Sequence, residues 1–217
     1  SKGYISYLRG ENPISFPVRL YPRHDLDKII KNPGISIDIF GKEISDEKRL
    51  SFLELYSSKL IGKQYEIYIN HCHKFKGLEK LRIEDETLLL QLGNIVYPGE
   101  DKVVENLYGE NGLLNNMNEN IKQGCIQYSY KKEVIDKYGE FFHKDLIGEY
   151  SSKIKNILEI IERSEGIIFI YTNWIKSGVI PLVLALEQNG YRKYDGKEIL
   201  KTKDKIKLIS YEGKTIS

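Results

Sequence analysis

The sequence has few cysteines, no long apolar run and no excess of charge of one sign. Cys72 and Cys125 stand far apart among 217 residues, so they do not form the disulfide framework of a small secreted domain. The longest apolar stretch, Val179–Leu186, is far shorter than the roughly 20 residues that cross a bilayer. A net charge of +2 permits a local basic patch without demanding a nucleic-acid partner. We therefore expect a protein of a reducing compartment, neither membrane-bound nor secreted.

A hydrophobic content of 41% is enough for a packed core. The chain divides into three stretches, residues 1–62, 63–148 and 149–217, without an internal repeat or a low-complexity tract. Because it begins with Ser1 rather than Met, we expect it to be a piece of a longer protein.

Local patterns predict the secondary structure of the first two stretches. Apolar residues and an acidic start predict a helix over Ser45–Leu60, and alternation predicts a strand at Tyr65–Ile69. A Gly- and Asn-rich composition predicts that residues 109–124 are irregular, with a short helix inside. Further predictions are a helix at Asp85–Leu92, a loop at Gly93–Gly99, and strands at Ile126–Tyr130 and Ile206–Tyr211.

The third stretch has the clearest pattern. Ser151 or Ser152 is a typical N-cap for an amphipathic helix that ends near Gly166. Ile167–Tyr171 is a continuous apolar run, typical of a parallel strand covered on both faces. A second helix follows and stops at Gly190. Helix, strand and helix with short joints indicate an α/β layer.

Several segments carry a family resemblance. The residues that carry it in the C-terminal block are Tyr150–Ile154, Gly166–Thr172, Ser177–Leu182 and Ala185–Tyr191, preceded by Gly3–Pro13, Phe16–Pro22, Asn94–Pro98 and Tyr108-Gly109 in the expected order. The C-terminal block resembles motif IV of Swi/Snf-like superfamily 2 helicases, in the form found in nucleocytoplasmic large DNA viruses. Such proteins include the poxvirus early transcription factor large subunit and its giant-virus relatives.

The resemblance implies an α/β fold: a partial RecA-like second helicase lobe with a mixed or irregular insertion. Thr172 and Asn173 follow the predicted strand, at the edge where α/β folds place ligand-facing residues, and Ser177 begins the next helix. The family uses this edge to face a nucleic-acid backbone, so these three residues, with Arg9 and Arg19, are the candidate contacts. The alternatives are that Asn173 and Ser177 cap the helix and that the arginines pair with acids.

The sequence lacks the residues that bind and hydrolyse ATP in such a motor. A phosphate-binding loop reads G-x-x-x-x-G-K-[ST], but Gly213-Lys214-Thr215 has Leu208 where the first glycine belongs. We therefore expect ATP and Mg²⁺ to bind the full-length parent and not this chain, which alone should be inactive. The implied partners are DNA or RNA, the first helicase lobe and the viral transcription machinery, in the host cytoplasm or the virion.

Other readings remain open. The chain could be a non-catalytic α/β binding or scaffold module that keeps the lobe fold, or an independent α/β enzyme. His71-Cys72-His73 lacks further ligands at zinc spacing, and no nucleophile signature stands beside Cys72. Tyrosines alternate with other residues in strand-like runs, at Tyr65, Tyr68, Tyr128 and Tyr130. This pattern is more typical of side-chain packing in a sheet than of base stacking.

Overall fold

The computed structural model describes residues 29–30, 35–49, 55–75, 78, 80–100, 103–122, 124–194, 196–201, 208–209 and 215–216. Arg9, Arg19 and the N-terminal patterns at 3–13 and 16–22 lie outside these ranges. The α-helices are α1 (Gly62–Cys72), α2 (Ile83–Leu92), α3 (Gly109–Asn116), α4 (Lys132–Tyr138), α5 (Ser152–Arg163) and α6 (Ile180–Gln188). The strands pair as β1 (Ile29–Ile30) with β2 (Leu55–Tyr56), β3 (Met117–Lys122) with β4 (Cys125–Tyr130), and β5 (Leu208–Ile209) with β6 (Thr215–Ile216).

In the part of the chain that the structure describes, the buried apolar side chains form two clusters among the helices. The larger cluster joins α5, α6 and the β3–β4 hairpin, and its largest fully buried side chains are Tyr97, Tyr128, Phe141 and Phe142. The smaller one lies where α1 contacts α2, around Ile67, Leu88, Leu92, Val96 and Leu107.

The segment Tyr65–Ile69 is helical, so the predicted strand is wrong. It lies within α1, whose buried residues are Gln64 and Ile67, while the Tyr65 side chain is exposed. A spacing of three residues puts Gln64 and Ile67 on one helix face, against α2. An alternating pattern over only five residues resembles a strand. Helix α2, which covers the buried face of α1, lies later in the sequence, so a five-residue pattern does not show which face is buried.

Two other predictions in the first half need correction. Within Ser45–Leu60 the described residues form a 3₁₀ turn at Asp46–Lys48 and the short strand β2 instead of one helix. Residues 109–124 are largely regular, because α3 runs directly into β3. The predicted helix at Asp85–Leu92, the loop after it and the strand at Ile126–Tyr130 are confirmed.

Helix α5 matches its prediction. The Ser151 hydroxyl caps it by accepting a hydrogen bond from the Ile154 N–H, 3.0 Å away. The helix buries Ile154 and Leu158 and ends at Arg163, just before Gly166, which takes a positive φ of 87°. The amphipathic pattern and the cap residue were sufficient local signals.

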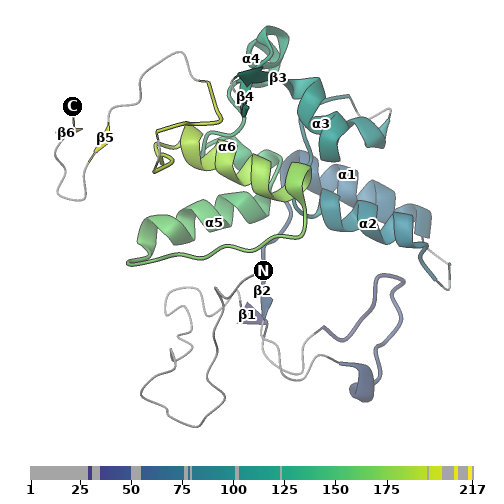
Figure 1. Ribbon diagram of the computed structural model, residues 1–217. Coiled ribbons are helices and arrows are strands. Elements are labelled where there is room, and N and C mark those ends of the chain that lie inside the picture. The colour runs from purple at the N-terminus through teal and green to yellow at the C-terminus, as the bar shows by residue number, and fades with distance from the viewer. Residues whose placement is uncertain are drawn as a thin grey trace, which may run out of the picture.

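The predicted buried strand at Ile167–Tyr171 is wrong for this chain. The segment forms no β-ladder, and all five side chains are exposed. It runs back along α5 toward α6 (Figure 1). A continuous apolar run favours a strand, but a buried strand needs neighbouring strands to pair with, and the described residues provide none for this segment.

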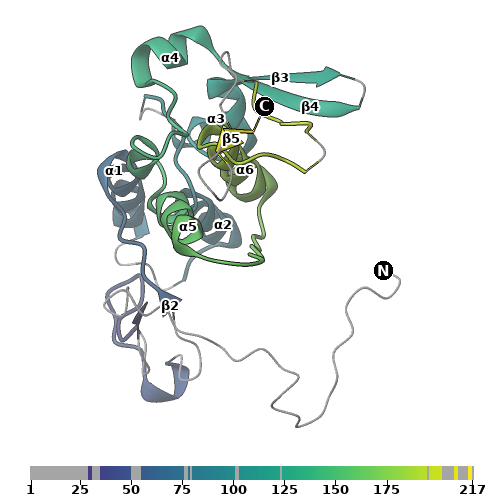
Figure 2. The ribbon, with the colours of Figure 1, turned by 90° about the vertical axis from the view of Figure 1, so that its left-hand side faces the viewer.

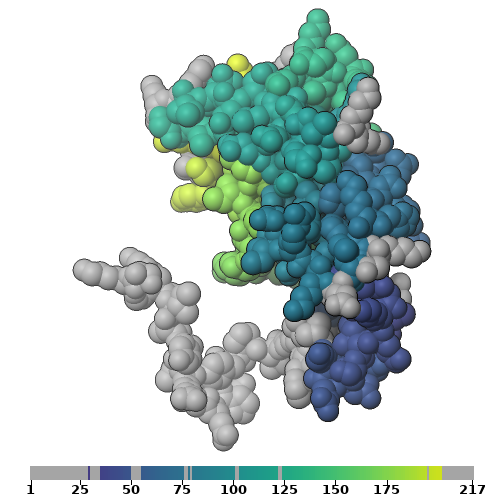
Figure 3. Space-filling view, turned by 90° about the vertical axis from the view of Figure 1, so that its right-hand side faces the viewer, coloured from purple at the N-terminus to yellow at the C-terminus, as the bar shows by residue number. Residues whose placement is uncertain are grey.

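The fold is mixed helix and strand, which agrees with the α/β class in its coarse sense. The described sheets are small and antiparallel, and a single parallel bridge, Tyr128 with Leu200, adds a third segment to β4. The β3–β4 hairpin projects from the helical body (Figure 2), at the opposite end from residues 35–49 (Figure 3). No helix in the described part of the chain has the length and apolar content needed to cross a membrane.

Candidate nucleic-acid interface

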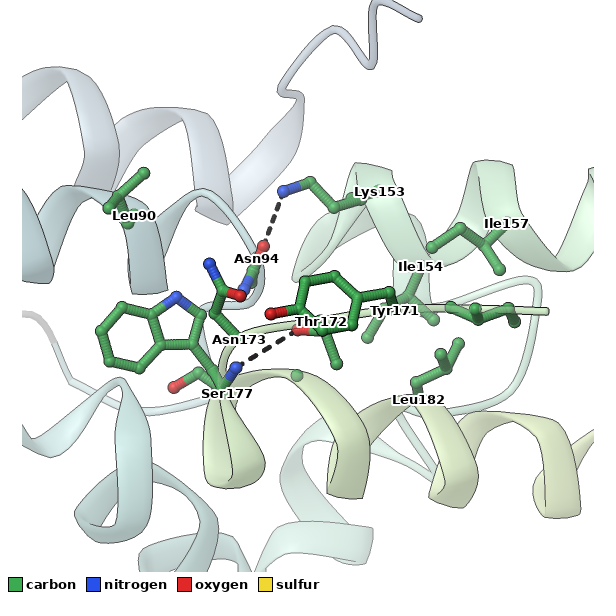
Figure 4. Close-up of a pocket in the computed structure, with 13 residues that line it drawn as sticks. Leu90, Asn94, Lys153, Ile154, Ile157, Tyr171, Thr172, Asn173, Ser177 and Leu182 are labelled. Atoms are coloured by element: carbon green, nitrogen blue, oxygen red, sulfur yellow. Dashed lines mark hydrogen bonds between the residues drawn. The ribbon is translucent and has the colours of Figure 1, made fainter. Parts of the chain in front are cut away.

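A cavity of about 280 Å³ lies between α2, α5 and the start of α6 (Figure 4). Most of its lining residues are apolar, and three segments contribute polar groups. The apolar lining is Leu90, Ile154, Ile157, Ile170, Tyr171, Trp174, Gly178 and Leu182, and the polar lining is Asn94, Lys153, Thr172, Asn173 and Ser177.

Asn94 ties the loop after α2 to the first turn of α5. The Lys153 ammonium donates a hydrogen bond to the Asn94 side-chain oxygen at 2.6 Å, as Figure 4 shows. The Ser151 hydroxyl donates to the Asn94 carbonyl at 2.5 Å, and the Val96 N–H donates to the Tyr150 carbonyl at 2.9 Å. Two segments of the family resemblance, Asn94–Pro98 and Tyr150–Ile154, therefore lie in direct contact.

The Lys153 ammonium is the positive charge of this cavity. Although Lys153 as a residue is exposed, its ammonium lies against the loop, and burial there lowers its pKa. A nearby anion would favour the charged form and offset that cost. As a cation in the cavity lining, the ammonium can pair with an anionic ligand such as a phosphate.

The turn at Thr172 and Asn173 presents polar groups at the cavity. The Thr172 hydroxyl accepts a weak hydrogen bond from the Trp174 N–H at 3.4 Å, and Asn173 is exposed. Gly178 lies so close to Thr172 that a Cβ at Gly178 would collide with the threonine side chain. This close approach holds the turn against the first turn of the following helix.

Ser177 lies at the start of the next helix, as predicted, but its side chain is buried. It is buried within the π-helical turn η6 (Ile175–Val179), which precedes α6. Its hydroxyl accepts a hydrogen bond from the Gly109 N–H at 2.9 Å and donates to the Gln91 side-chain oxygen at 2.9 Å. Both bonds point into the protein, so the Ser177 hydroxyl neither caps the helix nor is offered to a ligand. Of the candidate contacts in the described part of the chain, Thr172 and Asn173 remain, while Arg9 and Arg19 stay predictions.

Lys176 connects the π-helical turn to the β3–β4 hairpin. The Lys176 ammonium lies 3.1 Å from a Glu119 carboxylate oxygen and 3.3 Å from the Tyr128 hydroxyl. The Lys176 carbonyl accepts a hydrogen bond from the buried Tyr97 hydroxyl at 2.6 Å. These contacts hold the π-helical turn in place. Such turns often occur at functional sites.

Among the residues that the structure describes, no side chains gather into a site for the metal ion of a nucleotide. Gly213-Lys214-Thr215 lacks the partner glycine of a phosphate loop. In the part of the chain that the structure describes, no three His, Cys, Asp or Glu side chains gather as metal ligands. His71 and His73 lie at the end of α1, where residues two apart point to different sides, unlike on an extended chain.

Sequence reasoning missed three members of the cavity as functional candidates. Asn94 and Lys153 belong to the motif segments, but only contact across the fold shows that they share a site. Trp174, the only tryptophan of the chain, lines the same cavity. Its position directly after Thr172 and Asn173 was the available signal.

Comparison with known proteins finds a distant viral relative. The chain is 25% identical over 227 aligned residues, 89% of its length, to a protein of Acanthamoeba polyphaga mimivirus named "Putative ATP-dependent RNA helicase L377". The alignment takes in only 17% of that protein, so the chain corresponds to less than a fifth of it. No family model and no solved structure matches the chain. The similarity over most of the chain supports a relationship to a giant-virus helicase.

Proposed function

We propose that this chain is part of a longer superfamily 2 helicase or translocase that uses ATP to act on DNA or RNA in viral transcription. The observation that carries the proposal is the similarity to the mimivirus protein over 89% of the chain. The contact between the segments Asn94–Pro98 and Tyr150–Ile154 adds support, because the resemblance rests on both.

Within that parent, the chain supplies part of the second RecA-like lobe. Helix α5, the extended segment Ile167–Tyr171 and α6 follow each other through short joints, as in a helix–strand–helix unit of such a lobe. ATP and Mg²⁺ bind elsewhere in the parent, with the first lobe. The mechanical step is closure of the two lobes around ATP and reopening after hydrolysis.

The nucleic-acid backbone lies at the mouth of the cavity. Thr172 and Asn173 can donate hydrogen bonds to phosphate oxygens, and the Lys153 ammonium adds a positive charge beside them. Contacts of this kind fix position and carry no base sequence, which suits a protein that moves along its substrate.

The test replaces Asn173 by aspartate in the full-length gene product. A carboxylate at this place repels phosphate, so the nucleic-acid concentration that half-stimulates ATP hydrolysis rises about tenfold, equivalent to about 1.4 kcal/mol. Asn118→Asp is the matched control, because Asn118 is exposed on the β3 strand, away from the cavity. Equal half-stimulating concentrations for the two variants would exclude this turn as the nucleic-acid contact.

A further inference from the structure

The cavity between α2, α5 and the start of α6 has apolar walls that the described part of the chain leaves uncovered. Trp174 and Tyr171 both line it, and Tyr171 is 78% exposed, whereas Trp174 is partly exposed. Leu90 of α2 lines the same cavity and is 54% exposed. Exposed apolar and aromatic side chains that gather around one cavity are typical of a site that binds an apolar or aromatic group.

Two asparagine side chains add hydrogen-bonding groups to these walls. The Lys153 ammonium donates to the Asn94 side-chain oxygen and so orients the amide, whose nitrogen makes no hydrogen bond to another described residue. Asn173 is exposed at the turn and lines the cavity with Asn94 (Figure 4). An amide both donates and accepts, so this pair can bind the edge of a nucleobase, which carries donors and acceptors in one plane.

The size and polarity of the cavity restrict its ligand. Its volume of about 280 Å³ lies just below the roughly 300–1,000 Å³ of typical small-molecule sites, so it suits one ring system better than a whole nucleotide. A phosphate is unsuited to the interior, because most of the lining is apolar and burial of an unpaired charge is costly. The interior therefore suits an uncharged planar ring, with the phosphate chain outside.

We propose that the cavity receives one unpaired base of a single-stranded nucleic acid, which stacks on the Trp174 indole and hydrogen-bonds to Asn94 and Asn173. The inference rests on the proposed function, because the base enters the cavity whose mouth contacts the backbone. A base inside a duplex cannot reach a side cavity unless it is flipped out, so the substrate is a single strand. Since every base has an aromatic face, stacking tolerates any sequence, as a protein that moves along its substrate requires.

The test uses the fluorescence of Trp174, which is the only tryptophan of the 217-residue chain. The probes are a short single-stranded oligonucleotide, made as RNA and as DNA, its duplex, and a strand of equal length and charge whose sugars lack bases. The ordinary single strand quenches the emission in a saturable way. The abasic strand binds at least about tenfold more weakly and does not quench, because nothing stacks on the indole. The duplex does not quench either.

Two variants and a matched control locate the contact. With a labelled single strand, whose anisotropy reports binding, Trp174→Ala weakens the affinity by about tenfold or more, and Trp174→Phe, which keeps a ring, by less than about threefold. Tyr65→Ala leaves the affinity unchanged, because Tyr65 is an exposed aromatic residue of α1 that does not line the cavity. Circular dichroism checks that each variant folds, and the comparison with the abasic strand needs no variant.

The outcomes separate this inference from the proposed function. Equal affinity for the ordinary and the abasic strands would overturn the base site and leave the backbone contact standing. Equal affinity of Trp174→Ala and Tyr65→Ala for the single strand would overturn it as well, as would quenching by the duplex to the same extent. If neither RNA nor DNA binds in any form, both the base site and the backbone contact fall.

Discussion

The Ser177 hydroxyl accepts a hydrogen bond from the backbone N–H of Gly109, which precedes it by 68 residues, at 2.9 Å. The same hydroxyl donates to Gln91 near the end of α2. One buried side chain therefore connects the π-helical turn before α6 with two helices of the middle stretch. The cavity mouth keeps its shape because this turn is held from inside the protein.

Ser177→Ala should destabilise the chain. It leaves the buried Gly109 N–H without this partner, and a buried unpaired group costs about 1–3 kcal/mol. The Gln91 side-chain oxygen, which is partly buried, also loses its donor. The free energy of unfolding, from urea titration followed by circular dichroism, should fall by at least about 1 kcal/mol. Ser36→Ala is the control, because Ser36 is exposed and the change should stay within about 0.5 kcal/mol. Equal values for the two variants would contradict the role given to Ser177.

Gln64 joins α1 to two other elements. Its amide N–H donates to the Leu92 carbonyl at 2.8 Å, and its side-chain oxygen accepts from the Ser152 N–H at 2.9 Å. Because Gln64 is fully buried, Gln64→Leu strands two backbone groups and should lower the unfolding free energy by about 2 kcal/mol or more. Asn70→Ala, at an exposed position of the same helix, should change it by less than about 0.5 kcal/mol. A neutral Gln64→Leu would show that this tie does not stabilise the fold.

Gly112 lies where α3 packs most closely. A Cβ there would stand 2.5 Å from a Tyr97 ring carbon and 2.8 Å from the Leu107 backbone. Since the backbone atom cannot move freely, Gly112→Ala should cost about 1–3 kcal/mol by overpacking, in spite of the better helix propensity of alanine. Thermal denaturation should show a lower midpoint. A raised midpoint would mean that the contact between α3 and its neighbours is looser than the structure has it.

Glu119 should make stability depend on acidity. Hydrogen bonds from the Tyr128 hydroxyl and the Lys176 ammonium lower its pKa below the usual 4.5. A carboxylate whose pKa is lower in the folded state stabilises the fold fully at pH values above its unfolded-state pKa. This stabilisation is lost as pH falls through the folded-state pKa. Glu119→Gln should therefore flatten the loss of stability on acidification below about pH 4.5, measured by urea midpoints between pH 7 and 3. The exposed Glu165→Gln serves as the control, and parallel curves for wild type and Glu119→Gln would refute the assignment.

Lys176 should make stability depend on pH in the alkaline range. Burial alone would lower its pKa, but the hydrogen bonds with Glu119 and Tyr128 outweigh burial and raise it above the usual 10.5. The resulting stability is present below 10.5 and is lost as pH rises through the folded value. Lys176→Met should weaken the decline of the urea midpoint above pH 10. An unchanged alkaline limb would show that Lys176 is not the group responsible.

Local signals predicted what local interactions determine. Helix α5 and its Ser151 cap followed from an amphipathic pattern and a cap residue within one turn of each other. Tyr65–Ile69 was misread because its helix face is selected by α2, which follows later in the chain. The Ser177 side chain was misassigned because its partner, Gly109, is distant in sequence and can be found only in the folded chain.

The residues around the candidate cavity could be predicted only in part, for a similar reason. Thr172 and Asn173 do lie together at a cavity, but the cation that accompanies them, Lys153, comes from another helix and is placed by Asn94. The apolar run Ile167–Tyr171 has the alternation of a strand without the burial. An apolar composition shows that the segment is suited to burial in a sheet. Burial itself requires neighbouring strands. The boundaries at residues 62 and 148 stay predictions.

The most direct measurement is phosphate release from ATP by the full-length gene product and by this 217-residue chain, each with and without RNA or DNA. We expect the full-length product to hydrolyse ATP faster when nucleic acid is added, and the 217-residue chain to release no more phosphate than a mock preparation. Steady turnover by the 217-residue chain, or a full-length product that nucleic acid does not stimulate, would contradict the assignment to a helicase motor.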